Sequence, residues 1–410
     1  MIMKIYCKFK QTFLFKCLFF LRYLFIRYIL NKRIKRCYLY HDLKIIPVDK
    51  GINFFGYYNL HPTNGSCETL FLKVQHEDSR GSCQENAKIM KITSMQEKKM
   101  VAETAAWNWQ QGAMLQWYPK GSNTIIFNNY NSIDDCYEAC HSDLSGNVIK
   151  TYSAPIYTIN HEKKHALTLN FDRLRKMRPD YAYFNRKGTE IFTDDKDGVF
   201  KLDFISNKVE LILSLKTLRE LSYVDIMEDA EHKVNHLEYN PSGTRFMFLH
   251  RWVGPKGRYT RLLTSDENGE NLKILNGDIM TSHSCWLDDD RIVAFCEYND
   301  KTGYYMFNDK TGEVKLFSNQ LPLVDGHPSL SPDGKYLLTD TYPDKSRFSS
   351  LLLLDIKANK LITLGLFKQA LRYRGEKRID LHPKWGLDSK SIYFESGHNG
   401  RRNLFKMELK

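Results

Sequence analysis

The sequence predicts an all-β fold, a seven-bladed β-propeller preceded by an N-terminal hydrophobic and basic helix. Three observations predict it. A strand–turn–strand pattern recurs along most of the 410 residues, and its last four copies start 47, 44 and 55 residues apart. Long amphipathic helices are scarce after residue 45, and aromatic and basic residues are concentrated in the first 37 residues. Since 42% of the residues are hydrophobic, the chain can bury a large core, which excludes global disorder.

The first element is the N-terminal segment. Residues 12–30 are long enough to cross a bilayer, which takes about 20 residues, but Lys16, Arg22 and Arg27 interrupt them. Each such charge costs roughly 2.5–3.5 kcal/mol at mid-membrane depth. The three cations fall on one side of a helix, so the pattern favours a helix lying in the plane of an anionic membrane surface. A spanning or signal-anchor helix and a helix packed on the protein itself are the alternatives.

The net charge of +12 is local to this segment. Ten Lys and Arg residues lie between Lys4 and Arg36, so the rest of the chain carries only +2. This argues against nucleic acid as a partner and for an anionic membrane surface contacted by residues 12–36. We divide the chain into a leader, residues 1–40, and a propeller, residues 41–410. Nine cysteines without a CxxC pair suit a reducing compartment. We therefore expect a cytoplasmic protein, peripheral at the inner membrane surface, with export or membrane anchoring as alternatives.

The propeller prediction depends on seven similar segments. Each begins with an apolar strand, continues through a turn rich in Pro, Asp, Ser, Gly and Lys, and ends in a β-rich strand. The segments begin at Asn53, Gln116, Ile156, His236, His283, His327 and His382. Second hairpins, with turns at residues 309–312 and 357–359, lie between copies, and two hairpins make a four-stranded blade. Periods of roughly 40–50 residues are typical of propellers, whereas two β-sandwich domains would not explain the repeated start.

Histidines mark four of these starts. The innermost strand of a propeller blade begins near one mouth of the central channel, and His236, His283, His327 and His382 occupy that position in successive blades. We expect the four imidazoles to converge at one mouth, where they could bind a metal or transfer protons. Taken singly, each histidine has an alternative role in packing or in the turn before its strand.

Two stretches, HPSLSPDGKYLLTD and HPKWGLDSKSIYFESGHNGRRNLFKM, resemble propeller repeats of the TolB type, and this likeness covers most of residues 230–410. A narrower resemblance is to oligogalacturonate lyases, seven-bladed propellers that cleave acidic sugars with a divalent metal. The segments that carry it are Asn235-His236, His250 in FLHRW, Ser282-His283 before Trp286, and the HP motif at His382.

The resemblance implies a metal site, with Mn²⁺ as the expected ion, and we assign His283, His327, His382 and Asp380 to it. The sequence departs from the family pattern just before the last blade. Asp380 stands where the family has a histidine, and Lys377 stands where it has a glutamine. An aspartate can ligate manganese or magnesium, but a lysine ammonium cannot.

Two basic segments are candidates for binding an acidic substrate. Residues 173–178 contain four cations, including Arg173 and Arg178, and a planar guanidinium suits carboxylate or phosphate. Arg251 could extend this anionic-ligand surface. The alternative for the 173–178 segment is a solvated loop.

Aromatic and amide side chains are candidates for contacts with a sugar. Trp109, Trp117 and Gln111 lie close together in the sequence and offer two aromatic faces and an amide, although packing in the core is the alternative. Asp325, just before the His327 strand, is a further candidate for substrate binding.

β-Elimination beside a uronate needs three functions. The carboxylate must be neutralised, a base must remove the adjacent proton, and an acid must protonate the leaving oxygen. We assign neutralisation to the metal or to Arg173 or Arg178, the base to His250 with His236 as second candidate, and the acid to an arginine or Tyr181. The sequence thus predicts a lyase acting on an acidic oligosaccharide or polysaccharide. The alternative is a non-catalytic propeller that serves as a binding or scaffold module in cell-surface polysaccharide metabolism. A hydrolase would need a carboxylate pair at the mouth, for which the sequence offers no convincing candidate.

Overall fold

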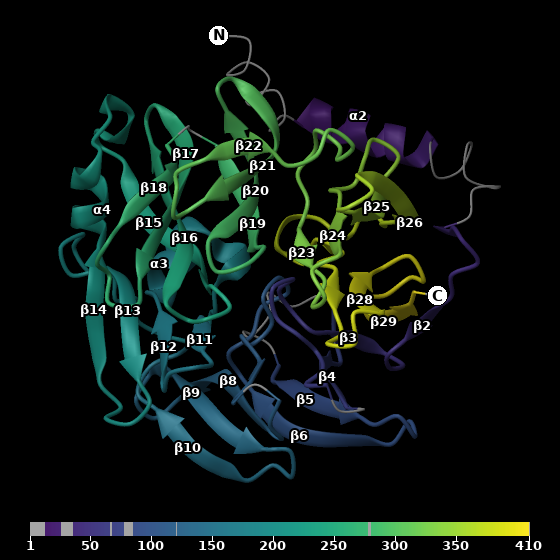
Figure 1. The fold of residues 1–410 in the computed structure, drawn as a ribbon. Helices are drawn as coiled ribbons and strands as arrows, with labels where there is room; N and C mark the ends of the chain where they lie inside the picture. Colours follow the sequence, from purple (N-terminus) through teal and green to yellow (C-terminus); the bar gives the residue numbers. More distant parts are fainter. Residues whose placement is uncertain are drawn as a thin grey trace.

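The computed structural model describes residues 13–25, 36–65, 68–77, 85–119, 121–277 and 280–409. Its strands form seven antiparallel sheets, and Figure 1 shows them following one another in a ring in chain order. The predicted seven-bladed β-propeller is confirmed.

Each of the first five blades is a four-stranded sheet formed by one stretch of chain. Blade 1 consists of β3 (Ile52–Phe54), β4 (Thr69–Val74), β5 (Ala87–Ile92) and β6 (Lys98–Thr104). Blade 2 consists of β7 (Gln116–Trp117), β8 (Thr124–Asn131), β9 (Cys136–Asp143) and β10 (Val148–Tyr152). Blade 3 consists of β11 (Thr158–Asn160), β12 (His165–Thr168), β13 (Gly198–Asp203) and β14 (Val209–Ser214). Blade 4 consists of β15 (Glu231–Tyr239), β16 (Arg245–Gly254), β17 (Gly257–Asp266) and β18 (Lys273–Asn276). Blade 5 consists of β19 (Thr281–Trp286), β20 (Arg291–Tyr298), β21 (Lys301–Asn308) and β22 (Val314–Leu316).

The last two blades each include a strand from the N-terminal side of the chain. Blade 6 consists of β23 (Ser329–Leu330), β24 (Tyr336–Asp340), β25 (Phe348–Asp355) and β26 (Lys360–Lys368), with β1 (Cys37–Leu39) as a fifth strand beside β26. Blade 7 consists of β27 (Lys384–Trp385), β28 (Ser391–Ser396) and β29 (Asn403–Glu408), and β2 (Ile45–Pro47) is its outer strand.

The ring is closed by main-chain pairing between the two ends of the propeller. β2 runs antiparallel to β29, with Ile45 opposite Met407 and Pro47 opposite Phe405. The chain then continues directly into blade 1. β1, which pairs with β26, lies within residues 1–40 that were assigned to the leader.

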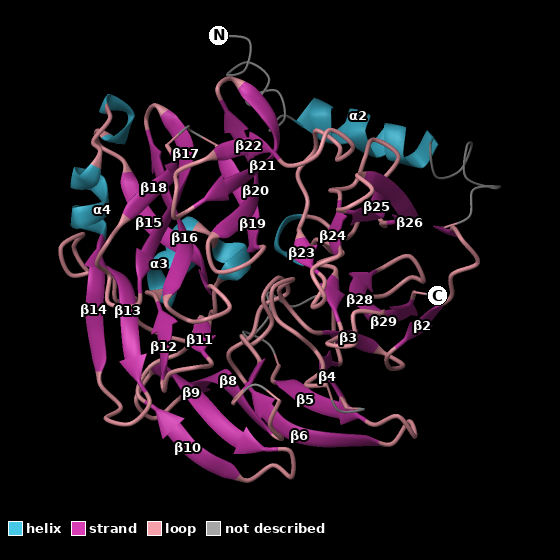
Figure 2. Cartoon of the chain, in the orientation of Figure 1, coloured by secondary structure: helices cyan, strands magenta, loops and turns pink. Residues whose placement is uncertain are grey.

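Helices occur in the N-terminal segment and in the connections between strands (Figure 2). They are α2 (Phe13–Leu24), α3 (Phe171–Met177), α4 (Leu215–Leu221) and the short 3-10 turns η3 (Pro179–Tyr181), η4 (Asp225–Met227) and η5 (Gly375–Lys377). Residues 1–12 and 26–35 of the predicted leader lie outside the described residues. Within the described ranges, no helix is long and apolar enough to span a bilayer.

A tryptophan in the first strand of blades 5 and 7 joins each of these blades to the preceding one. Trp286 donates through Nε1 to the carbonyl of Glu238 in blade 4, and Trp385 donates to the carbonyl of Ser329 in blade 6, both at 3.1 Å. Both indoles are buried. In blades 5 and 7 this tryptophan therefore fixes the contact with the preceding blade.

Candidate functional site

The four blade-start histidines lie next to one another, on or just before the first strands of blades 4 to 7, and we call this part of the ring the mouth. The ring centroids of successive pairs are 5.5 Å apart for His236 and His283, 4.1 Å for His283 and His327, and 4.4 Å for His327 and His382. All four side chains are buried. Residues that are more than 140 positions apart in the sequence therefore form one cluster, which we call the histidine cluster.

Irregular backbone directs these side chains. His236 and His382 have positive φ angles of 57° and 43°, a conformation that is uncommon for residues other than glycine. The pairing of β15 with β16 shifts register between Asn235 and Glu238, and that of β19 with β20 shifts between Thr281 and Ser284. Such bulges re-aim side chains and occur beside functional sites.

Carboxylates orient two of the imidazoles. His283 Nδ1 lies 3.0 Å from an oxygen of Asp325, whose other oxygen accepts a hydrogen bond from Ser282 Oγ at 2.6 Å. His327 Nδ1 lies 2.8 Å from Asp340. A carboxylate on one ring nitrogen is the usual arrangement that fixes the tautomer of a metal-binding histidine.

His327, Asp380 and His382 could hold a metal ion. One ligand atom from each lies within 4.8 Å of the others, and all three side chains are buried. In the described chain, Nε2 of His327 and both ring nitrogens of His382 are buried without a hydrogen-bond partner. Buried polar atoms rarely go unpaired, so these nitrogens fit a ligand that no protein atom supplies.

The electrostatics differ between the two histidines of this set. Burial, then the cationic form of His327 and the cations of Lys384 and Arg378, lower the pKa of His382 well below its usual range. Burial alone would also lower the pKa of His327, but the carboxylates of Asp340, Asp380 and Asp325 together outweigh burial, and the pKa is raised. His382 is thus neutral and free to bind a metal, whereas His327 must release a proton to do so.

Three tyrosines complete the mouth. The hydroxyl of Tyr57 lies 2.8 Å from His236 Nδ1, and the hydroxyl of Tyr58 donates to the carbonyl of Ser284 at 2.8 Å. The Tyr181 ring lies 5.8 Å from the rings of both Tyr57 and His236. Its hydroxyl is buried and interacts with the Tyr57 hydroxyl and the Arg178 guanidinium. Tyr181 therefore places a third hydroxyl at the mouth.

A chain of alternating charges connects blade 3 with the segment before blade 7. Arg178 Nε lies 3.0 Å from Asp180, Asp180 lies 2.5 Å from Arg378 Nη1, and Arg378 Nε donates to Asp380 at 2.6 Å. Because Asp380 belongs to the candidate metal set, this chain positions one of its ligands. The backbone of the same segment is fixed by Arg402 and Gln110, which donate to the carbonyls of residues 376–378.

The structure places His250 within blade 4, apart from the histidine cluster. Its Nε2 lies 2.8 Å from His232 Nδ1, and its Nδ1 accepts a hydrogen bond from Arg261 Nε at 3.1 Å. The imidazole also packs against Trp252. Both nitrogens of the residue first assigned as base are thus engaged in the body of the blade.

Arg173 is also engaged structurally. It donates through Nε to Asp197 at 2.7 Å and through its other nitrogens to the carbonyls of His232 and Phe192. The segment predicted as a solvated loop or ligand surface is in fact helix α3, whose first turn is capped by Asn170. Arg173 is thereby used to join blade 3 to blade 4.

The predicted sugar-binding group is buried. Trp109 and Trp117 are 3% and 5% exposed, and Trp109 packs on Phe54. Gln111 donates to the hydroxyl of Tyr157 at 2.7 Å, and that hydroxyl accepts from the backbone N–H of His236. Gln111 thus helps to fix the backbone of His236 through the Tyr157 hydroxyl.

Several site residues escaped the sequence analysis. Asp180 and Arg378 could have been found, because Arg-x-Asp occurs at 178–180 and again at 378–380. Tyr57 and Tyr58 follow Gly56, whose φ of 131° and close approach to the carbonyl of Gln111 exclude a side chain. A glycine followed by two tyrosines could therefore have indicated a tight backbone bend that positions Tyr57 and Tyr58.

No family model and no curated protein matches the chain. Solved structures do. The oligogalacturonate lyase of Vibrio parahaemolyticus is 14% identical with a TM-score of 0.61, and an oligogalacturonate lyase in complex with manganese is 14% identical with a TM-score of 0.65. Each match covers 91% of this chain and 96% of the other. TolB from Acinetobacter baumannii is 13% identical with a TM-score of 0.41, over 75% of this chain and 67% of the other.

The chain has the fold of the two lyase structures. At such identities the likeness extends to the fold alone, and the chemistry must be argued from the mouth itself.

Proposed function

We propose that this propeller is a lyase that cleaves a uronic-acid-containing oligosaccharide or polysaccharide by β-elimination at the mouth of its channel. The observation that carries the proposal is the convergence of four buried histidines and three tyrosines, with unpaired nitrogens on His327 and His382. The likeness to solved oligogalacturonate lyases supports the choice of substrate class.

The proposed metal ligands are His327, Asp380 and His382, with His283 beside them. The unpaired imidazole nitrogens and the buried carboxylate fit a divalent cation, and a carboxylate in the set suits Mn²⁺. Bound there, such an ion would neutralise the uronate carboxylate and make the neighbouring C–H more acidic.

His236 is the proposed base in place of His250. Burial, then the nearby Arg251 cation, lower the pKa of His236 well below its usual range, so the imidazole is neutral at pH 7 and can accept a proton. The hydroxyl of Tyr57 orients its ring. His250 lacks a free nitrogen for this role.

Tyr181 is the proposed acid, and Arg251 binds the substrate. The buried hydroxyl of Tyr181 lies within the same group of rings as His236, beside the Arg178 cation, and can protonate the departing glycosidic oxygen. The C–O bond breaks as the proton beside the carboxylate passes to His236, and a carbon–carbon double bond forms in the product.

The test follows the ultraviolet absorbance of the unsaturated product with uronate oligosaccharides and added Mn²⁺. His236→Asn and His327→Ala should each lower kcat by at least about 100-fold, the usual contribution of a catalytic base. His398→Asn, which alters a histidine bonded to Ser396 outside the histidine cluster, should retain full activity. Full activity in His236→Asn would refute the assignment of the base. If wild-type protein forms no unsaturated product from any uronate, the lyase proposal is refuted and the alternative, a non-catalytic binding or scaffold module, is favoured.

For the N-terminal segment we propose attachment to an anionic membrane surface on the cytoplasmic side. The support is the excess of cations between Lys4 and Arg36 and the exposure on α2 of Leu18, Phe20 and Leu21. Full-length protein should sediment with vesicles containing about 30% anionic lipid, and protein lacking residues 1–35 should not. Equal sedimentation of the two proteins would refute this attachment.

A further inference from the structure

Four cations gather at the mouth-side end of blade 4. Lys233 lies in β15 and Arg251 directly opposite it in β16, while Arg258 is the second residue of β17 and Arg178 follows α3. We call them the blade-4 cation group. None of them is among the candidate metal ligands.

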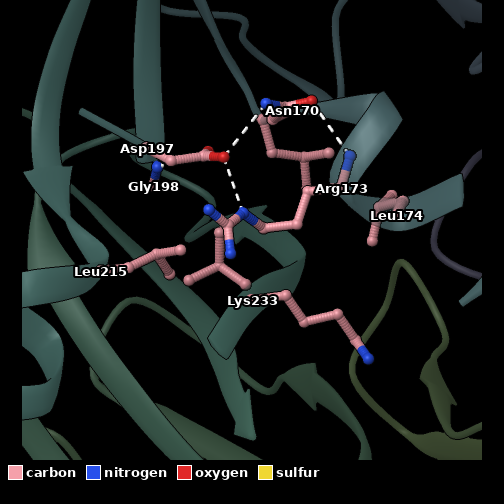
Figure 3. Close-up of a pocket in the computed structure, with 9 residues that line it drawn as sticks. Asn170, Arg173, Leu174, Asp197, Gly198, Leu215 and Lys233 are labelled. Carbon is pink, nitrogen blue, oxygen red and sulfur yellow. Dashed lines mark hydrogen bonds and ion pairs between the residues drawn. The ribbon is translucent and has the colours of Figure 1, made fainter. Parts of the chain in front are cut away.

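The positive charge of the buried Lys233 ammonium has few polar partners. Its side chain is 4% exposed, and its ammonium donates to the carbonyl of Met177 at 3.4 Å. Its stem lines a small pocket with Arg173 and Asp197, but Figure 3 shows its ammonium turned away from Asp197, which Arg173 and Asn170 already bind. The nearby Asp180 carboxylate pairs with Arg178 and Arg378.

Arg251 also forms no ion pair with any residue that the structure describes. Its Nε is buried and has no hydrogen-bond partner among the residues that the structure describes. Besides burial, the main groups that act on its pKa are the cation of Arg178 and the hydroxyls of Tyr181, Tyr57 and Tyr342. Two of these tyrosines, Tyr57 and Tyr181, belong to the mouth, so the Arg251 cation interacts electrostatically with the mouth.

Burial and the neighbouring cations both lower the pKa of Lys233. Burial, followed by Arg251, Arg178 and Arg258, lowers the pKa of Lys233 to about 7, and Asp180 opposes this only in part. Burying cations without partners costs free energy. An anion bound between them would recover that cost and would raise the pKa of Lys233.

We propose that Lys233 and Arg251, assisted by Arg178, form a second anionic subsite that binds the carboxylate of the sugar unit adjoining the one cleaved. This rests on the proposed function, in which the metal set takes the carboxylate of the cleaved unit. The enzyme would then prefer substrates whose consecutive units are both acidic over chains that alternate acidic and neutral sugars.

The experiment measures binding without turnover. Full-length protein treated with a chelator is titrated calorimetrically with saturated dimers of galacturonate, glucuronate and mannuronate, and with the matching monomers. Wild-type protein should bind at least one dimer about tenfold more tightly than its monomer, as expected for an added charge-assisted contact. Lys233→Met should lose this preference, and Lys233→Arg should keep it.

Lys176→Met is the matched control. Lys176 is an exposed lysine of the neighbouring helix α3 that pairs with Glu231 at 2.8 Å, so its loss removes a charge without altering the subsite. Its dimer preference should be unchanged.

Proton uptake gives a second readout. In buffers of different ionisation enthalpy at pH 8, dimer binding should be accompanied by proton uptake in wild-type protein, because the bound carboxylate raises the pKa of Lys233 from about 7. Lys233→Arg should show none, since arginine stays charged.

The outcomes separate the two proposals. An unchanged dimer preference in Lys233→Met, or no preference for any dimer in wild-type protein, overturns the subsite. A dimer preference that depends on Lys233, in a protein that forms no unsaturated product once Mn²⁺ is restored, supports the subsite and refutes the lyase.

Discussion

The carboxylate of Asp340 holds His327 twice: it accepts a hydrogen bond from the backbone N–H and lies against Nδ1, both at 2.8 Å. Since a carboxylate only accepts, Nδ1 keeps its proton, and when His327 releases its second proton the Nε2 lone pair is left for a metal. The second carboxylate oxygen of Asp340 accepts a hydrogen bond from the backbone N–H of His382 at 3.2 Å. One side chain thus positions two candidate ligands.

Replacing Asp340 should weaken metal binding. Asp340→Asn removes the charge that fixes the tautomer, and we expect about 10–100-fold lower affinity for Mn²⁺. Equilibrium dialysis with metal analysis measures this. Asp355→Asn, in the next strand of the same blade, is the control. Equal affinity in Asp340→Asn would contradict the orienting role.

Arg402 and Glu395 form a buried ion pair at 2.8 Å, with side chains 3% and 0% exposed. Arg402→Met leaves the Glu395 charge unpaired and should lower the free energy of unfolding by about 3–5 kcal/mol. Urea unfolding measures the loss. Adding Glu395→Gln should recover part of it, and a double variant no more stable than Arg402→Met would speak against the pairing.

Closure of the ring should depend on residues 36–47. Removing residues 1–35 leaves β1 and β2 in place, so this protein should unfold as cooperatively as the full chain. Removing residues 1–47 takes away both strands and exposes the edge of β29. It should unfold at lower denaturant concentration or aggregate, and equal stability of the two proteins would show that β2 does not close the ring.

The inter-blade hydrogen bond of Trp385 can be tested alone. Trp385→Phe keeps an aromatic ring but leaves the carbonyl of Ser329 without this donor, which should cost about 1–3 kcal/mol. Chemical denaturation measures the change. Trp286→Phe should cost a similar amount, because it loses the equivalent bond to Glu238, and no loss in either variant would show that these bonds contribute little.

Acid should destabilise the propeller through His232. Burial is the main cause that lowers its pKa to about 4 from 6.5. The unfolded state therefore binds the proton first, so this contribution to stability is complete above pH 6.5 and is lost as pH falls toward 4. His232→Asn should show a shallower loss of stability across that window. An identical pH profile would mean that other groups control acid unfolding.

The sequence predicted the ring and the convergence of histidines because a repeat places equivalent residues at equivalent positions. It could not show that His250 bonds to His232, since that contact depends on which face of β16 points inward. Nor could it show that Trp109 and Trp117 are buried, because aromatic residues serve cores and sugar sites alike. Arg378 and Asp180 meet only through the fold, although the repeated Arg-x-Asp pattern was visible.

The central claim is that cleavage proceeds by elimination at the histidine cluster. Mass spectrometry of products formed in heavy-oxygen water tests it most directly. With Mn²⁺ present, elimination predicts products that incorporate no solvent oxygen and whose masses add up to that of the substrate. Incorporation of one solvent oxygen per cleavage would show hydrolysis, and the absence of cleavage of any uronate chain would show that the propeller is not a lyase.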